Sequence, residues 1–149
     1  MFKAQIMLGA AVQRYVKGAR YERELINILY SMGYSVIRSA GSGVSSLSPD
    51  ILAIRDGVCL SIECKAWENG SLSLDDDGYG KLRAWEGNTK SQTFIGWRMN
   101  GKGWYFIRLE EFSKAVKNWN ITRKRTIEIN RKLEDVIAVS MQSRQLPGT

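Results

Sequence analysis

The chain has 149 residues, a formal net charge of +7 and a hydrophobic share of 44%, which together predict one globular domain spanning residues 1–149. The excess of Lys and Arg favours a polyanionic partner, nucleic acid first and an anionic membrane surface second. No apolar run approaches the roughly 18 residues that cross a bilayer, so we expect an intracellular protein. The sequence has no histidine, which excludes Cys/His zinc sites, serine–histidine triads and histidine general bases.

A helix is predicted from about Arg14 to Met32, after an extension, residues 1–13, that has no clear period. Leu25 and Leu29 fall on one face of this helix, and Gly33 supplies the C-terminal stop. At 100° per residue Glu22 lies at the centre of the apolar face, and Glu24 is expected to face away.

A carboxylate inside an apolar face is costly unless it is paired or bound to a metal. We favour a place for Glu22 in an active site. The alternatives are that the start of the helix lifts it clear of the core, or that it pairs with a nearby basic residue. Around it Lys17, Arg20 and Arg23 suit phosphate contacts, although each alone could be a solvated charge.

Alternating apolar and polar residues predict a strand over 34–39, which contains Arg38. The following loop, residues 40–48, is small and polar. It lacks the Gly-Lys-Ser/Thr ending of a P-loop. Because it leads directly to Asp50, we expect Ser42 at the rim of any site there, although a plain connector needs no function.

The stretch 49–65 predicts a β-hairpin, because two apolar runs flank Asp56-Gly57, a strong signal for a two-residue turn. With these two residues at the centre of the turn, even pairing puts Asp50 opposite Glu63. Directly opposed residues lie on one face with Cβ atoms about 4.5–5.5 Å apart. A slip of one residue would separate the two carboxylates.

Two facing carboxylates are normally destabilising, so we expect a compensating cation. Lys65 shares the face of Glu63 by the period-2 rule, and Mg²⁺ prefers carboxylate oxygens. We therefore favour a metal site at Asp50 and Glu63, with the Cys64 carbonyl as a further oxygen, over an exposed charged pair. Cys59 and Cys64 point to opposite faces and should not form a disulfide.

The rest of the chain gives weaker predictions. Its expected segments are a polar acidic loop over 67–80, a short helix over 79–90, two hairpin strands over 93–98 and 104–108, a helix over 109–119, a basic stretch over 114–132, an apolar core or oligomer strand over 133–139, and a flexible tail over 141–149. The basic stretch is interpreted as a nucleic-acid flank, with a soluble charged face as the alternative.

A carboxylate on the first helix, then Asp, then Glu-x-Lys, resembles the layout of the PD-(D/E)xK nuclease superfamily. The motifs in 17–25, 33–42, 49–51 and 62–65 closely resemble the archaeal Holliday-junction resolvases. Beyond residue 66 the resemblance is weak: the counterpart of a later helix, around 81–90, is shorter and lacks the glutamine usual near its start.

The resemblance implies an α/β fold with a central mixed sheet flanked by helices, like that of restriction endonucleases. It also implies a homodimeric, Mg²⁺-dependent endonuclease, with Mn²⁺ a plausible substitute, that acts on four-way DNA junctions in recombination and repair. By this resemblance Glu22, Asp50 and Glu63 serve the metal, Lys65 serves the water, Arg23 and Arg38 support DNA binding or catalysis, and Ser42 touches the site as a catalytic and DNA-binding candidate. To these we add, from the residues themselves, Cys64 at the metal and Lys17 and Arg20 as DNA contacts.

Two other functions stay open. Another nuclease of the superfamily, cutting flaps, ends or a specific sequence, would use the same cluster. A non-catalytic basic DNA-binding protein would share the charge but would not need Asp50 opposite Glu63.

Overall fold

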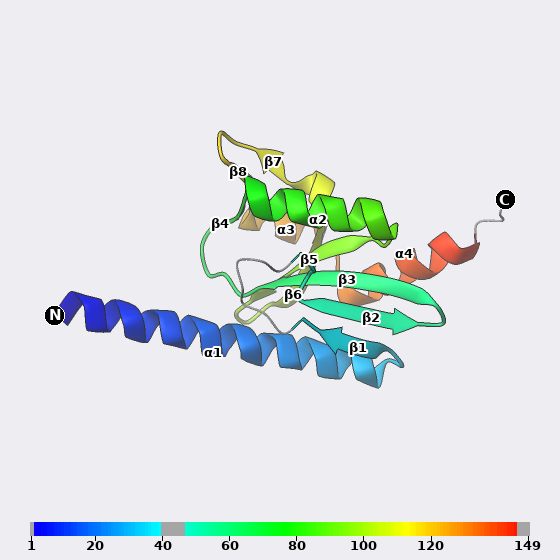
Figure 1. Ribbon diagram of the computed structural model, residues 1–149, viewed down its shortest axis with the longest axis horizontal. Helices are drawn as coiled ribbons and strands as arrows, with labels where there is room; N and C mark the ends of the chain where they lie inside the picture. The colour runs from blue at the N-terminus through cyan, green and yellow to red at the C-terminus, as the bar shows by residue number, and fades with distance from the viewer. Residues whose placement is uncertain (1, 40–46, 146–149) are drawn as a thin grey trace.

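A five-stranded mixed sheet forms the centre of the protein in the computed structural model, which describes residues 2–39 and 47–145, with side chains over 18–39 and 47–142. Its strands, in spatial order, are β1 (Ser35–Arg38), β2 (Ile51–Arg55), β3 (Val58–Lys65), β5 (Thr93–Met99) and β6 (Gly103–Arg108). β3 and β5 run parallel and the other pairs antiparallel. Helices cover the sheet (Figure 1), which confirms the expected α/β architecture.

Helix α1 spans Phe2–Ser31 and is much longer than predicted. The predicted start at Arg14 is wrong, because residues 2–13 continue the helix although they lack an apolar period. The C-terminal stop is confirmed: Gly33 has φ +90°, a conformation that glycine adopts without strain. The first half of α1 extends past the sheet (Figure 1).

The β2–β3 hairpin has the predicted turn and register. Asp56 and Gly57 have φ of 52° and 77°, as a two-residue turn with two left-handed residues requires. Arg55 pairs with Val58, and the ladder continues evenly to Ile51 opposite Ile62. The next pair in this register is Asp50 and Glu63.

The expected acidic loop is wrong, because this segment forms strand β4 (Ser71–Asp75) and the first turn of helix α2 (Asp76–Thr89). Leu72 and Leu74 alternate with exposed residues and are buried, which is the pattern of a half-buried strand. The Asp75 carboxylate caps α2 by accepting from the Gly78 N–H at 2.6 Å.

The helix expected over 109–119 is also wrong. A short 3-10 helix, η1 (Leu109–Glu111), leads into β7 (Ser113–Lys114) and β8 (Asn118–Thr122). These two strands form a second sheet with β4, in the order β4-β8-β7. Trp119, taken as a helical position, stacks on Tyr79 of α2 with ring centroids 3.9 Å apart. Tertiary packing of aromatic side chains decides this segment, and helical spacing does not.

Helices α3 (Arg123–Ile129) and α4 (Leu133–Gln145) complete the chain. The expected strand over 133–139 is wrong, although its place in a core is right: Leu133 and Val136 pack with Leu25 and Leu29 of α1. A second core fills the opposite side of the sheet between β5, β6, α2 and the small sheet. None of the helices in the described residues is long and apolar enough to cross a membrane.

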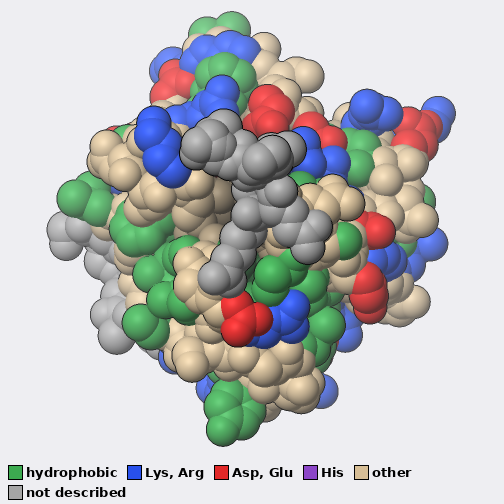
Figure 2. Space-filling model, turned by 90° about the vertical axis from the view of Figure 1, so that its right-hand side faces the viewer, with side chains coloured by type: hydrophobic (Ala, Val, Ile, Leu, Met, Phe, Trp, Pro, Cys, Tyr) green, Lys and Arg blue, Asp and Glu red, His purple; other side chains and the backbone are tan. Residues whose placement is uncertain are grey.

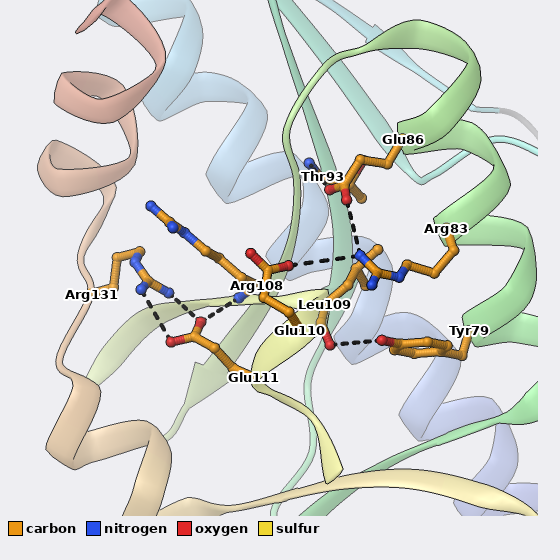
Figure 3. A network of polar contacts seen from close by, with 9 residues as sticks. All are labelled: Tyr79, Arg83, Glu86, Thr93, Arg108, Leu109, Glu110, Glu111 and Arg131. Atoms are coloured by element: carbon orange, nitrogen blue, oxygen red, sulfur yellow. Dashed lines mark hydrogen bonds and ion pairs between the residues drawn. The ribbon is translucent and has the colours of Figure 1, made fainter. Parts of the chain in front are cut away.

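A polar network fastens the segment before α4 to the edge strand β6. Glu111 accepts from both terminal nitrogens of Arg131, at 2.5 and 3.2 Å, and from the Arg108 N–H at 2.6 Å (Figure 3). The Arg131 carbonyl accepts from the Phe106 N–H at 2.9 Å. Arg131 thereby covers part of the outer edge of β6, which would otherwise offer unpaired backbone groups.

Four of the five tryptophans donate an indole N–H to another element. Their acceptors are Ser61 for Trp85, the Trp67 carbonyl for Trp97, Glu24 for Trp104 and Asp76 for Trp119, at 2.8 to 3.0 Å. Each bond joins two different parts of the fold.

Candidate active site

Asp50 and Glu63 meet at the end of the hairpin away from its turn. The Asp50 N–H donates to Glu63 Oε1 at 3.2 Å, and the Cys64 N–H donates to Asp50 Oδ2 at 2.8 Å. The two carboxylates are thus held side by side by backbone groups of the same two strands. The hairpin register, set at Asp56-Gly57, fixes this pair.

The electrostatics of the pair are unfavourable without a cation. Burial, the negative charge of Asp50 and a hydrogen bond with Asp50 together raise the pKa of Glu63 to about 8. The nearby Lys65 ammonium acts in the opposite direction but does not compensate. A divalent ion with oxygen ligands would remove this mismatch, since it favours the ionised form of both acids.

Cys64 could offer a metal ion either its thiol or its backbone carbonyl. Burial raises the pKa of its thiol well above the usual value, and the charges of Asp50, Glu22 and Glu63 raise it further. The thiol therefore stays protonated at neutral pH and is a poor hard-metal ligand. The Cys64 backbone carbonyl is the group that suits such an ion. Both cysteines are free thiols.

Glu22 does not join the carboxylate pair directly. Its Oε2 accepts from Arg38 Nε at 2.7 Å, and the side chains are 19% and 43% exposed. Pairing with a basic residue was the alternative interpretation of this carboxylate. Among residues 18–39 and 47–142, no group of three or more Cys, Asp or Glu side chains is close enough to hold a metal ion.

Strand alternation explains why Glu22 stays apart from the Asp50–Glu63 pair. Ile62 and Cys64 pack into the core covered by α1, so the intervening Glu63 side chain turns to the other face of β3. Glu22 approaches from the α1 side, where its charge acts on Cys64. The structure brings together Asp50, Glu63 and Lys65, and places Glu22 with Arg38 beside them.

The remaining candidates are exposed on α1 or lie outside the described residues. Arg20 and Arg23 are exposed on α1. Ser42 and the Lys17 side chain lie outside the described residues.

Glu24 is a residue whose position was predicted wrongly. It does not face away: its Oε1 accepts from Arg98 Nε at 3.0 Å and from Trp104 Nε1 at 2.9 Å. The sequence signal that could have found it is the pair of donors, because Arg98 and Trp104 lie opposite each other in the predicted hairpin. That α1 docks onto this hairpin is a tertiary contact and follows from no local spacing.

A mixed sheet between helices, with Asp opposite Glu-x-Lys at the end of its central hairpin, defines a nuclease core of the restriction-endonuclease-like class. Residues 13–145 match the family model described as archaeal Holliday junction resolvase, Hjc. The chain belongs to this archaeal Holliday junction resolvase family, which confirms the resemblance noted in the motifs.

Relatives and solved structures agree with this assignment. The chain is 32% identical over 106 residues to the crossover junction endodeoxyribonuclease Hjc of Archaeoglobus fulgidus, covering 70% of this chain and 78% of the relative. It is 33% identical over 112 residues to the Methanocaldococcus jannaschii protein of the same name, with coverages of 74% and 80%.

The solved structure of Archaeoglobus fulgidus Hjc, a Holliday junction resolvase, matches with a TM-score of 0.66 and 26% identity, over 75% of this chain and 88% of that one. The bacterial homing endonuclease I-Ssp6803I matches with a TM-score of 0.54 and 15% identity, over 89% and 97%, and so shares the fold. Family membership implies a divalent-metal-dependent nuclease and a branched DNA substrate.

Proposed function

We propose that this protein is a Mg²⁺-dependent endonuclease, a single nuclease domain over residues 1–149, that resolves four-way DNA junctions by paired cuts as a homodimer inside the cell. The observation that carries the proposal is the adjacent Asp50–Glu63 pair, with Glu63 driven toward protonation. Such a pair is poorly suited to stability and well suited to a hard cation.

The residues present fit a bound Mg²⁺, and Mn²⁺ could replace it. Asp50 and Glu63 would hold the ion, with the Cys64 carbonyl as a further oxygen. Glu22 would complete the acidic shell directly or through water. A bound ion would supply Lewis-acid polarisation of the scissile phosphate and an activated water.

The protein's own groups would do the rest of the work. Lys65 would orient the attacking water or offset charge that develops on the phosphate, since its ammonium lies close enough to affect Glu63. Arg20, Arg23 and Arg38, with Lys17 and Ser42, would hold the DNA backbone. Contacts of this kind read the shape of the substrate more than its sequence.

The Asp50–Glu63 pair lies at the end of the hairpin away from the β2–β3 turn. Figure 2 shows the opposite end of the molecule, which carries the β2–β3 turn: its described basic and acidic side chains are interspersed and form no continuous basic surface. The net charge of +7 is therefore not gathered on that face.

The test is cleavage of a synthetic four-way junction with Mg²⁺ by the native protein and by Glu63→Gln, beside a linear duplex and a flap of the same sequence. Glu128→Gln, in an exposed ion pair on α3, is the matched control for loss of one carboxylate. We expect paired symmetric nicks on the junction, retained in the control and lost in Glu63→Gln while junction binding persists.

The other outcomes separate the alternatives. Equal cutting of flap or duplex would indicate a general nuclease of the superfamily. Junction binding without any cutting by the native protein would leave a basic DNA-binding protein. Sedimentation of the protein with and without junction tests the homodimer, and a strictly monomeric enzyme would contradict paired cutting.

A further inference from the structure

Two carboxylates of α1, two residues apart, are held in very different ways. Glu22 has its hydrogen bond with Arg38, whose side chain is 43% exposed. The Glu24 side chain is 36% exposed and accepts from two donors, the Arg98 side chain, 20% exposed, and the indole of Trp104, a residue 8% exposed. The two ion pairs are similarly exposed and each contributes little by itself, so the difference lies in the second bond that Glu24 accepts from the mostly buried Trp104.

The two donors to Glu24 form a preorganised site on the sheet. Arg98 and Trp104 are direct cross-strand partners in the β5–β6 hairpin. The Arg98 guanidinium also lies 4.8 Å from the Tyr21 ring centroid and donates to the Met99 carbonyl at 2.9 Å. The Met99 contact orients Arg98 from within the hairpin, whereas Tyr21 belongs to α1 and adds its contact once the helix is docked. Glu24 then gains two bonds for the ordering of one side chain.

This contact lies one residue along the sheet from the partner of Lys65, on the face that α1 covers, whereas the Glu63 and Lys65 side chains lie on the other face. Lys65 pairs with Trp97 across β3 and β5, and Arg98 is the next residue along β5. The Tyr21 hydroxyl, one residue before Glu22, donates to Asn100 Oδ1 at 3.2 Å. The turn of α1 that carries Glu22 is therefore fastened to β5–β6 on one side and to β1 through Arg38 on the other.

We propose that Glu24 is a positioning residue: with Arg98 and Trp104 it fixes this turn of α1 on the β5–β6 hairpin and thereby sets the place of Glu22 beside the end of β3. Glu22 can then exchange Arg38 for another cation without movement of the helix. The inference rests on the proposed function, since Glu22 is assigned there to the acidic shell.

The first test reads the Glu22–Arg38 contact in the folded, metal-free protein. The ¹⁵N-HSQC signal of Arg38 Nε–H is compared in the native protein, Glu24→Ala, Glu24→Gln and Trp104→Phe, with Glu22→Ala as the reference for a lost contact. In Glu24→Ala we expect the signal to move at least halfway to the reference. Glu24→Gln keeps an oxygen acceptor and should stay near the native position, with Trp104→Phe between them.

A general loss of stability would not move this signal while the protein remains folded, and Glu128→Ala serves as the control. If Glu24→Ala leaves the Arg38 Nε–H signal at its native position, the proposal is wrong. This result does not require cleavage, so it decides the role of Glu24 even if the native protein cuts no substrate.

The second test is a double-mutant cycle on junction cleavage at saturating substrate. We expect Glu24→Ala to reduce turnover about tenfold with less than a twofold change in KM, and Glu24→Gln to restore most of it. Added to Glu22→Gln, the change Glu24→Ala should reduce turnover by less than a further factor of two, because it acts through Glu22. Multiplicative losses would overturn the proposal, whereas absence of cleavage by the native protein would count against the proposed function instead.

Discussion

Glu63 and Glu111 are both partly buried carboxylates, yet their surroundings act in opposite directions. Glu63 lies against Asp50, and burial with this second acid raises its pKa to about 8. Burial also disfavours the ionised form of Glu111, but the hydrogen bonds from Arg131 and the Arg108 N–H outweigh it and lower the pKa below the usual value. One carboxylate is left uncompensated and the other is fully satisfied.

The difference separates function from stability in this fold. The Glu111–Arg131 network joins η1 to the segment before α4 and holds the edge of the sheet. The Asp50–Glu63 pair satisfies no such structural need, and its repulsion is a strain that a bound cation would relieve. Functional sites often keep such locally unfavourable arrangements, which the rest of the structure supports.

The largest effect is expected on activity at Glu63. Glu63→Gln removes a proposed metal ligand and should lower single-turnover junction cleavage about a thousandfold, the equivalent of about 4 kcal/mol of transition-state stabilisation. The free energy of unfolding in EDTA at pH 8 should stay equal or rise, since a neutral amide ends the repulsion with Asp50. If Glu63→Gln were strongly destabilised and still cleaved the junction, Glu63 would have the structural role that is expected of Glu111.

Glu111→Ala should have the converse effect. It leaves the Arg131 guanidinium without its acid partner in a mostly buried position, which should lower the free energy of unfolding by about 2–3 kcal/mol. Urea denaturation measures this change. Cleavage per folded molecule should stay within twofold of the native rate, and a larger loss would mean that this network extends its influence to the site.

The pH dependence of stability in EDTA should separate the two acids further. The Glu63 contribution is fully present below its ordinary pKa of 4.5 and is lost as the pH rises toward about 8, a change of about 3 kcal/mol between pH 5 and pH 8. Glu63→Gln should flatten this loss, and Mg²⁺ should restore stability on the alkaline side.

The contribution of Glu111 to stability depends on pH in the opposite direction. Its contribution is present above the ordinary pKa of 4.5 and is lost as the pH falls through its lowered pKa. Glu111→Gln should therefore flatten the acid side of the curve of urea midpoint against pH. Identical curves for the two variants would remove the basis of the comparison.

The smallest effect is expected at Glu128, an exposed carboxylate 3.9 Å from Arg125 on α3. Glu128→Ala should change the free energy of unfolding by less than about 0.5 kcal/mol and leave cleavage unchanged. The same urea and cleavage measurements provide this baseline. A larger effect would point to an additional role for the basic stretch that contains it.

Local rules predicted the parts of the fold that local chemistry controls. The Asp56-Gly57 turn set the register that brings Asp50 to Glu63, and Gly33 ended α1 as expected. The hairpin between β5 and β6 was also predicted from its turn residues. In each case a residue with a special backbone preference stands at the point that decides the geometry.

The failures have a common physical origin in tertiary contacts. Trp119 lies in a strand and stacks on Tyr79, although its spacing predicted a helix. Glu24 accepts hydrogen bonds from two donors that are distant in the sequence. The position of Glu22 depends on the angle at which α1 crosses the sheet. The spacing of residues within α1 does not predict that angle. The carboxylate pair was therefore predictable, whereas the partner of each acid on α1 was not.

The indole N–H bonds of the tryptophans also make the protein a set of optical reporters. The fluorescence of Trp104 would report the contact of β6 with Glu24 of α1, and that of Trp85 the contact of α2 with β3. The fluorescence of Trp119 would report the contact of β8 with Asp76 of α2. Trp97, wholly buried, reports the main core. Variants that retain one indole at a time would let intrinsic fluorescence show which contact opens first on heating, without any label on the chain.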